Sequence, residues 1–158
     1  MKIISTNKSR GFIIEDESKN LLVAHYMDND FQELKTNFNG VDIVIRSIPE
    51  AVIFKNRIAQ GEIRFNSEGN ATIKLLDKID NTNNKEWELL TKRTWMKIYY
   101  SLINAEKESI LNIQISKQFF SQEYLYQLEI IDTKVAKNEL IELIFYSCFA
   151  SRHLRFES

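Results

Sequence analysis

The segment from Asn138 to Leu154, NELIELIFYSCFASRHL, constrains the fold of this 158-residue chain more than any other. Nine of the eleven residues from Leu140 to Ala150 are apolar, counting Tyr, Cys and Ala with the aliphatic residues. At about 100° per residue, these positions point nearly all the way round a helix axis. A helix that is apolar on most of its circumference must be covered on every side by protein or by lipid. We therefore predict a buried helix over about residues 138–153.

A membrane span is the other environment that would suit such a helix. The apolar run is only eleven residues long and Glu142 interrupts it, whereas a bilayer span needs about 20 apolar residues. We therefore favour a core helix and expect no transmembrane segment.

Ahead of this helix, short segments of alternating polarity separated by turn signals predict a mainly β protein. Residues 62–65 and 71–75 alternate on either side of a turn and predict a hairpin. Asn39-Gly40 predicts a type I′ turn, because both residue types tolerate the positive φ that this turn requires. Residues 95–103 alternate as well and predict a further strand. In total, the regular spacing of strand-like segments and turn signals predicts about ten to twelve strands over residues 3–132.

Three local predictions depend on single residues or on weak patterns. Residues 51–58 predict one strand. Phe31, Leu34 and Phe38 are weaker evidence for another strand, and Gln32 to Thr36 could form a helical turn instead. All four glycines, among them Gly61, are expected at strand boundaries, where their flexible backbone is useful.

The strands and the helix together predict a closed antiparallel barrel that encloses its own hydrophobic C-terminal helix. A meander of strands leaves exposed edges, and closure into a barrel removes them. The helix, which is apolar on nearly all sides, must be surrounded by other parts of the chain. The alternative is an α+β fold in which the helix packs on one face of an antiparallel sheet, but such a helix would have a clearer polar stripe. Residues 1–158 are expected to form a single domain.

Composition restricts the partners and the compartment. Lys and Arg number 21, Asp and Glu number 22, and the net charge is −1, so we expect no nucleic-acid partner. The single cysteine, Cys148, excludes an internal disulfide and fits a reducing compartment. The N-terminal apolar run is too short for a secretory signal. We expect a cytoplasmic protein, peripheral to a membrane if it binds lipid.

A chain of strands followed by one hydrophobic helix resembles the tubby-like C-terminal fold, which the LURP-one-related and phospholipid-scramblase families share. The resemblance rests on the hairpin that starts at Gly61, on residues 95–102 leading into 111–113, on residues 124–126, and on the helix over 140–150. It implies a barrel of about twelve strands around a central helix and a role at phospholipid membranes. The chain lacks the proline-rich segment and the cysteine cluster of scramblases, and no phosphoinositide-binding position of tubby proteins can be matched to it.

Lys92, Arg93 and Lys97, with Trp95 between them, form the best candidate for an anion-binding patch. Basic residues beside an aromatic ring could hold a phosphate headgroup at a membrane surface. The structural alternative is a solvated hairpin edge on which lysine discourages pairing with another strand.

A second candidate is a narrow polar stripe on the helix, formed by Glu139, Glu142, Tyr146 and His153. A carboxylate carried into a core must find hydrogen bonds or take up a proton. The structural interpretation is that the stripe faces a barrel mouth or pairs with a strand-borne Lys or Arg. The functional interpretation is a polar spot in an internal ligand cavity, with Glu142 and Tyr146 as the contacts.

The histidines, the cysteine and the aspartates of this chain suggest neither a catalytic site nor a metal site. His25 is expected on the polar side of a strand and His153 near the helix end, where a cation favours the helix dipole. Cys148 is expected to be a small core residue, and the histidines and the cysteine lack the spacing of a zinc site. Asp28-Asn29-Asp30 is half a calcium loop without its glycine and distal glutamate. We therefore predict no metal, no cofactor and no catalytic residue.

These observations rank three functions. A non-enzymatic binding module for a phospholipid headgroup or membrane surface comes first. A protein-interaction or structural domain comes second, and a barrel that binds a small ligand, or an enzyme, comes third.

Overall fold

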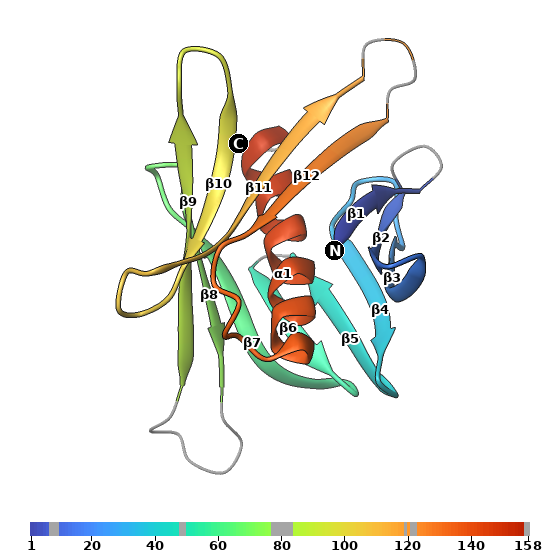
Figure 1. Cartoon of the computed structure of the whole chain (residues 1–158). Helices are drawn as coiled ribbons and strands as arrows, with labels where there is room; N and C mark the ends of the chain where they lie inside the picture. Colours follow the sequence, from blue (N-terminus) through green and yellow to red (C-terminus); the bar gives the residue numbers. More distant parts are fainter. Residues whose placement is uncertain (7–9, 48–49, 77–83, 119, 121–122, 157–158) are drawn as a thin grey trace.

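The computed structural model describes residues 1–6, 10–47, 50–76, 84–118, 120 and 123–156 (Figure 1). Within these residues the chain forms twelve strands and one helix, in the following order. They are β1 (Lys2–Ser5), β2 (Gly11–Asp16), β3 (Lys19–Tyr26), β4 (Glu33–Phe38), β5 (Val41–Arg46), β6 (Ala51–Lys55), β7 (Ile58–Phe65), β8 (Ala71–Leu75), β9 (Lys85–Arg93), β10 (Ile98–Ile103), β11 (Ser109–Lys117), β12 (Tyr124–Ile130) and α1 (Lys137–Phe156).

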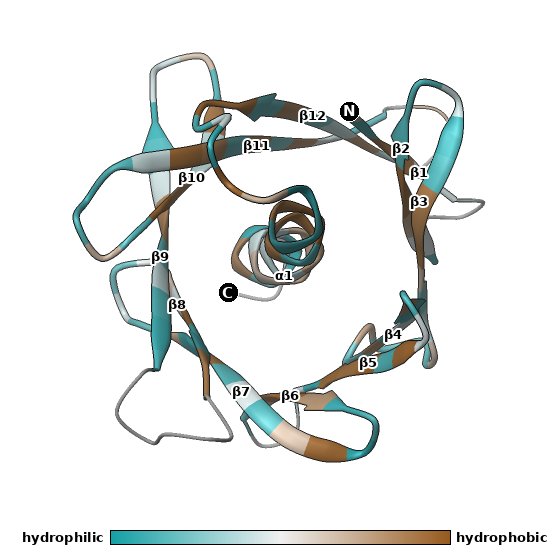
Figure 2. Ribbon diagram, turned by 60° about the horizontal axis from the view of Figure 1, so that its bottom comes forward, coloured by the Kyte–Doolittle hydropathy of each residue, from teal (hydrophilic) through white to brown (hydrophobic). Residues whose placement is uncertain are grey.

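The strands form one sheet in which each strand pairs antiparallel with the next along the chain. β1 and β12 lie side by side, so the sheet curls into a nearly closed barrel around α1 (Figure 2). The predicted mainly β barrel with a C-terminal helix is therefore confirmed, and the α+β alternative is wrong because the strands surround the helix. No helix in the described part of the chain is long and apolar enough to cross a membrane.

Because the strands alternate in direction, their connections alternate between the two ends of the barrel. The β3–β4, β9–β10 and β11–β12 connections lie at the end where α1 finishes, which we call the upper end (Figure 1). α1 begins at the opposite, lower end, where Lys137 donates a hydrogen bond to Asp16 at the end of β2. This hydrogen bond, with a second one from the N-terminal amine, lowers the pKa of Asp16.

α1 forms the axis of the hydrophobic core. Leu143, Ile144, Phe145 and Phe149, which point in different directions from the helix axis, are each at most 2% exposed. Around them, inward-facing residues of the strands complete the core, and the ring of Phe12 on β2 lies 6.1 Å from that of Phe145. Burial on all sides confirms the prediction made from the apolar circumference of this segment.

Tight turns decide two of the local predictions. Asn39 and Gly40 have φ of 52° and 77°, as the predicted type I′ turn between β4 and β5 requires. Asn56 and Arg57 also have positive φ, 48° and 69°, and form a second such turn. The uninterrupted strand over 51–58 is therefore wrong: the chain reverses between β6 and β7 without a glycine to mark the turn.

Two further local predictions differ in outcome. Residues 33–38 form β4, so the strand interpretation of that segment is correct. Gly61 lies inside β7 and not at its boundary. A Cβ atom at this position would lie 2.5 Å from the Lys74 carbonyl oxygen, so the glycine allows a close approach between β7 and β8.

Candidate functional site

The β9–β10 hairpin contains all four residues of the predicted basic patch. Arg93 ends β9 and Ile98 begins β10, so residues 94–97 form the turn and the predicted strand over 95–103 starts three residues too early. The Thr94 N–H donates to the Lys97 carbonyl oxygen at 2.9 Å, and the Lys97 N–H donates to Thr94 Oγ1 at 3.1 Å. These two bonds close the turn and project its two middle residues away from the barrel.

The two middle residues of this turn expose a large indole ring and a thioether to water. Trp95 is 93% exposed and Met96 is 71% exposed. Lys92, Arg93 and Lys97 flank them and are exposed as well. Within the described part of the chain, none of these three cations forms an ion pair, whereas Lys55, Lys85, Lys107 and Lys137 all do. The hairpin therefore combines exposed apolar groups with uncompensated positive charge.

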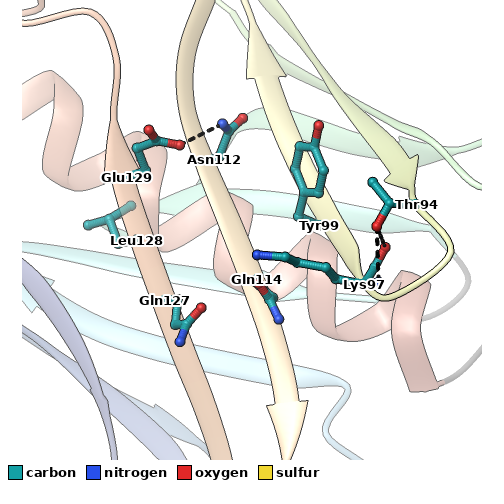
Figure 3. Close-up of a pocket in the computed structure, with 8 residues that line it drawn as sticks. All are labelled: Thr94, Lys97, Tyr99, Asn112, Gln114, Gln127, Leu128 and Glu129. Carbon is teal, nitrogen blue, oxygen red and sulfur yellow. Dashed lines mark hydrogen bonds between the residues drawn. The ribbon is translucent and has the colours of Figure 1, made fainter.

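A recess of about 340 Å³ lies on the outer face of the barrel beside this hairpin (Figure 3). The side chain of Lys97 extends from the turn across the recess toward β11. Behind it lie Gln114 on β11 and Gln127 on β12, which are paired residues of adjacent strands. The remaining lining residues are Thr94, Tyr99, Asn112, Leu128 and Glu129. The recess thus offers a cation and several amide groups to a polar ligand.

A second recess, of about 400 Å³, lies at the upper end of the barrel, where the hairpin approaches the end of α1. Arg93, Lys97 and Arg155 line it together with both apolar residues of the turn. Burial raises the pKa of Tyr100 behind this recess, while the positive charges of Arg155 and Arg93 act in the opposite direction. Cations from two distant parts of the chain therefore gather at one point of the rim.

Three residues of the polar stripe, Glu139, Glu142 and Tyr146, lie near the lower end of α1 and are separate from the hairpin, whereas His153 lies in the last turn of the helix. Lys55 Nζ at the end of β6 donates to Glu142 Oε2 at 2.7 Å, and the Tyr146 hydroxyl donates to the same oxygen at 3.1 Å. Lys85 pairs with Glu139 at 3.3 Å. The two glutamates of the stripe thus pair with strand-borne lysines, and the stripe and the basic hairpin are two separate candidates.

A recess of about 290 Å³ lies beside this stripe and includes Lys55, Glu142 and Tyr146 in its lining. Burial, and then the negative charge of Glu142, raise the pKa of Tyr146, so the phenol stays protonated and acts as a donor. Because Lys55 and Tyr146 already occupy the same oxygen of Glu142, the geometry explains this stripe as an internal polar network.

Replacing Lys55 by Met should destabilise the protein by about 1–3 kcal/mol, because Glu142 would lose its cation while keeping most of its burial. Both side chains of the pair are about one-fifth exposed, 21% and 22%, so water compensates for part of the loss. Urea denaturation measures the change. The double variant Lys55→Met/Glu142→Gln is the control and should recover part of the stability; equal losses in both variants would contradict this account.

The other candidate residues of the sequence lie apart from both sites. His25 is exposed on β3, and the ring of His153 stacks on Phe65 at 4.0 Å. Cys148 is fully buried, which raises the pKa of its thiol well above the usual value. The Asp28 carboxylate accepts the N–H of Gln32 at 3.0 Å and shapes the β3–β4 turn. The described residues contain no cluster of potential metal ligands.

Sequence reasoning missed the environment of Arg152. This residue of α1 is buried, and its guanidinium lies over the rings of Tyr26, Phe31 and Tyr124 at 4.9, 3.9 and 4.5 Å. These rings come from β3, from the turn after it and from β12, so no local pattern in the sequence could reveal the cluster.

Fold and sites together define a nearly closed twelve-stranded antiparallel barrel with an axial helix and a projecting basic, aromatic hairpin. No protein-family model, curated protein or solved structure matches this chain.

Proposed function

We propose that this protein is a non-enzymatic module that binds a membrane surface containing anionic phospholipids. The observation that supports the proposal is the β9–β10 hairpin, in which a 93% exposed Trp95 stands among three cations without ion pairs in the described structure. The barrel and its axial helix also fit the tubby-like C-terminal fold, and that resemblance is part of the same proposal.

The chemistry of the hairpin suits the boundary between lipid headgroups and acyl chains. Trp is favoured at this boundary because its ring is apolar while its N–H can still find a hydrogen bond. Lys and Arg beside it attract anionic headgroups, each by about 1 kcal/mol near the surface. The same hairpin would suit a protein partner through the exposed Trp95, because Trp often dominates protein interfaces. Lipid binding is favoured because three cations surround the ring.

Replacing Lys92, Arg93 and Lys97 together by Ala should weaken binding to vesicles of phosphatidylcholine with phosphatidylserine by roughly 100-fold. The estimate takes about 1 kcal/mol per cation and about 1.4 kcal/mol per tenfold change. Co-sedimentation with vesicles measures the affinity, which should also fall as salt is added, because salt screens these charges.

The matched control is the triple variant Lys19→Ala/Lys35→Ala/Lys134→Ala. It changes the net charge equally, and all three of its lysines are exposed, on β3, on β4 and in the segment before α1. This control should bind nearly as well as the unmodified protein. Equal weakening by both variants would point to net charge alone. Failure of the unmodified protein to bind anionic vesicles would reject the proposal and favour the protein-partner alternative.

A further inference from the structure

β10 and β11 stop pairing before either strand ends. Their ladder finishes at Tyr100 and Ile113, whereas β10 already begins at Ile98 and β11 continues to Lys117. Beyond the ladder, the β9–β10 hairpin and the β11–β12 hairpin diverge (Figure 1). The wall of the barrel is therefore open between these two neighbouring strands near the upper end.

The edge of β11 that faces this opening has main-chain groups that no strand of the described structure pairs with. The Gln118 N–H donates to the Glu123 carbonyl oxygen, so the even-numbered residues along β11 direct their main-chain groups to β12. The N–H and C=O groups of Ile115 and Lys117 therefore point toward β10, beyond the end of the ladder. A strand edge of this kind is a template for pairing with another strand.

Two recesses occupy the opening. The recess of about 400 Å³ at the upper end is lined by residues 93–98 of the β9–β10 hairpin and by residues 114–116 of β11. The recess of about 340 Å³ on the outer face shares Thr94, Lys97 and Gln114 with it (Figure 3). The two recesses are thus the two sides of one opening, and the edge of β11 is accessible from it.

Cations surround the opening. Arg93, Lys97 and Arg155 line the upper recess, and none of the described residues that line it is an aspartate or a glutamate. Lys117 ends the unpaired edge of β11 and is exposed. The charge of this opening therefore complements an acidic occupant and repels a basic one.

We propose that the unpaired edge of β11 binds an extended acidic segment of a partner protein, which adds to the barrel wall as a strand. The segment pairs with Ile115 and Lys117 in the space that β10 leaves. Side chains alternate along a strand, so every second one lies beside Ile98 and Ile115 on the inner face, and the others lie beside Lys97 on the outer face. Apolar side chains suit the first set and acidic side chains suit the second. This site is additional to the proposed membrane function, because its occupation needs no lipid.

A fluorescein-labelled peptide of alternating glutamate and valine tests the site, by fluorescence anisotropy with the full-length chain and without lipid. The peptide should bind, and its affinity should fall as salt is added. N-methylation of the valines should weaken binding roughly tenfold or more, because it removes the main-chain N–H groups that face β11. N-methylation of the glutamates is the matched control. That peptide should bind nearly as well as the unmodified one, because its methylated groups face away from β11.

Two variants at Lys117 test the same pairing from the side of the protein. Lys117→Pro and Lys117→Ala both remove the charge, but only proline removes the N–H that faces the opening. The β11–β12 ladder does not use this N–H, so proline is compatible with the strand. Lys117→Pro should bind the unmodified peptide roughly fivefold more weakly than Lys117→Ala.

Each other result has a definite meaning. Absence of peptide binding, or equal binding of the unmodified and both methylated peptides, would overturn the strand addition. Equal binding of a peptide of alternating lysine and valine would overturn the acidic partner. A dimer in size-exclusion chromatography that Lys117→Pro abolishes and Lys117→Ala preserves would assign the edge to a second copy of the chain and overturn the partner protein. All of these results leave the proposed membrane function intact, because vesicle binding measures that function separately.

Discussion

A chain that ends at Lys137, just before most of α1, is expected to form no soluble and cooperatively melting barrel. The deletion removes the axis of the core, because every residue of α1 from Leu143 to Arg152 is buried. The inward faces of the strands would lose the surface that covers them, and exposed apolar strands associate with one another. Solubility, size-exclusion chromatography and a thermal melt followed by circular dichroism measure the result.

The full-length chain is the control for this experiment. A truncated protein that stays monomeric and melts cooperatively would show that the strands support themselves without the helix. That outcome would contradict the central role of α1, since a helix at the membrane or on a partner could be removed without unfolding the barrel.

Replacing Phe145 by Ala should lower the free energy of unfolding by about 3–5 kcal/mol, the usual cost of removing a buried aromatic ring. The Phe145 side chain is fully buried and its ring lies 6.1 Å from Phe12 on β2 and 5.6 Å from Tyr146 on α1. This loss is a large part of the roughly 5–15 kcal/mol that stabilises a typical domain. Urea denaturation of the full-length protein measures the difference.

Phe120→Ala is the matched control, because it removes the same ring from a position that is 97% exposed. It should change the free energy of unfolding by no more than about 0.5 kcal/mol. A loss below about 1 kcal/mol for Phe145→Ala would mean that the surrounding strands collapse into the space, and that α1 is packed more loosely than its burial indicates.

The fold could be predicted because its main constraint is local. Apolar residues on every side of one short helix require a complete cover, and strands are the only other elements that the chain supplies. The φ values at Asn39 and Gly40 follow from residue type in the same way. The turn at Asn56 and Arg57 was missed because only its first residue is of a type that favours positive φ, and Arg57 gives no such signal.

The candidate sites were predictable only in part. The basic hairpin is contiguous in the sequence, so Lys92, Arg93, Trp95 and Lys97 could be grouped from their spacing alone. The partner of Glu142 could not, because Lys55 lies 87 residues earlier in the chain. Arg155 lies near the basic hairpin and was missed as well, because it is far from that hairpin in the sequence.

The sequence pattern therefore established which elements this protein contains. They are a helix that must be enclosed, strands of alternating polarity, and a hairpin that combines an indole with cations. Tertiary structure established where these parts meet, because the direction of each strand decides at which end of the barrel its connection lies. The pairing of Glu142 with Lys55 at one end, and the exposure of Trp95 and Phe120 at the other, both follow from that alternation. Closing a meander around a helix brings together residues that are far apart in the chain, and local propensity contains no information about those distances.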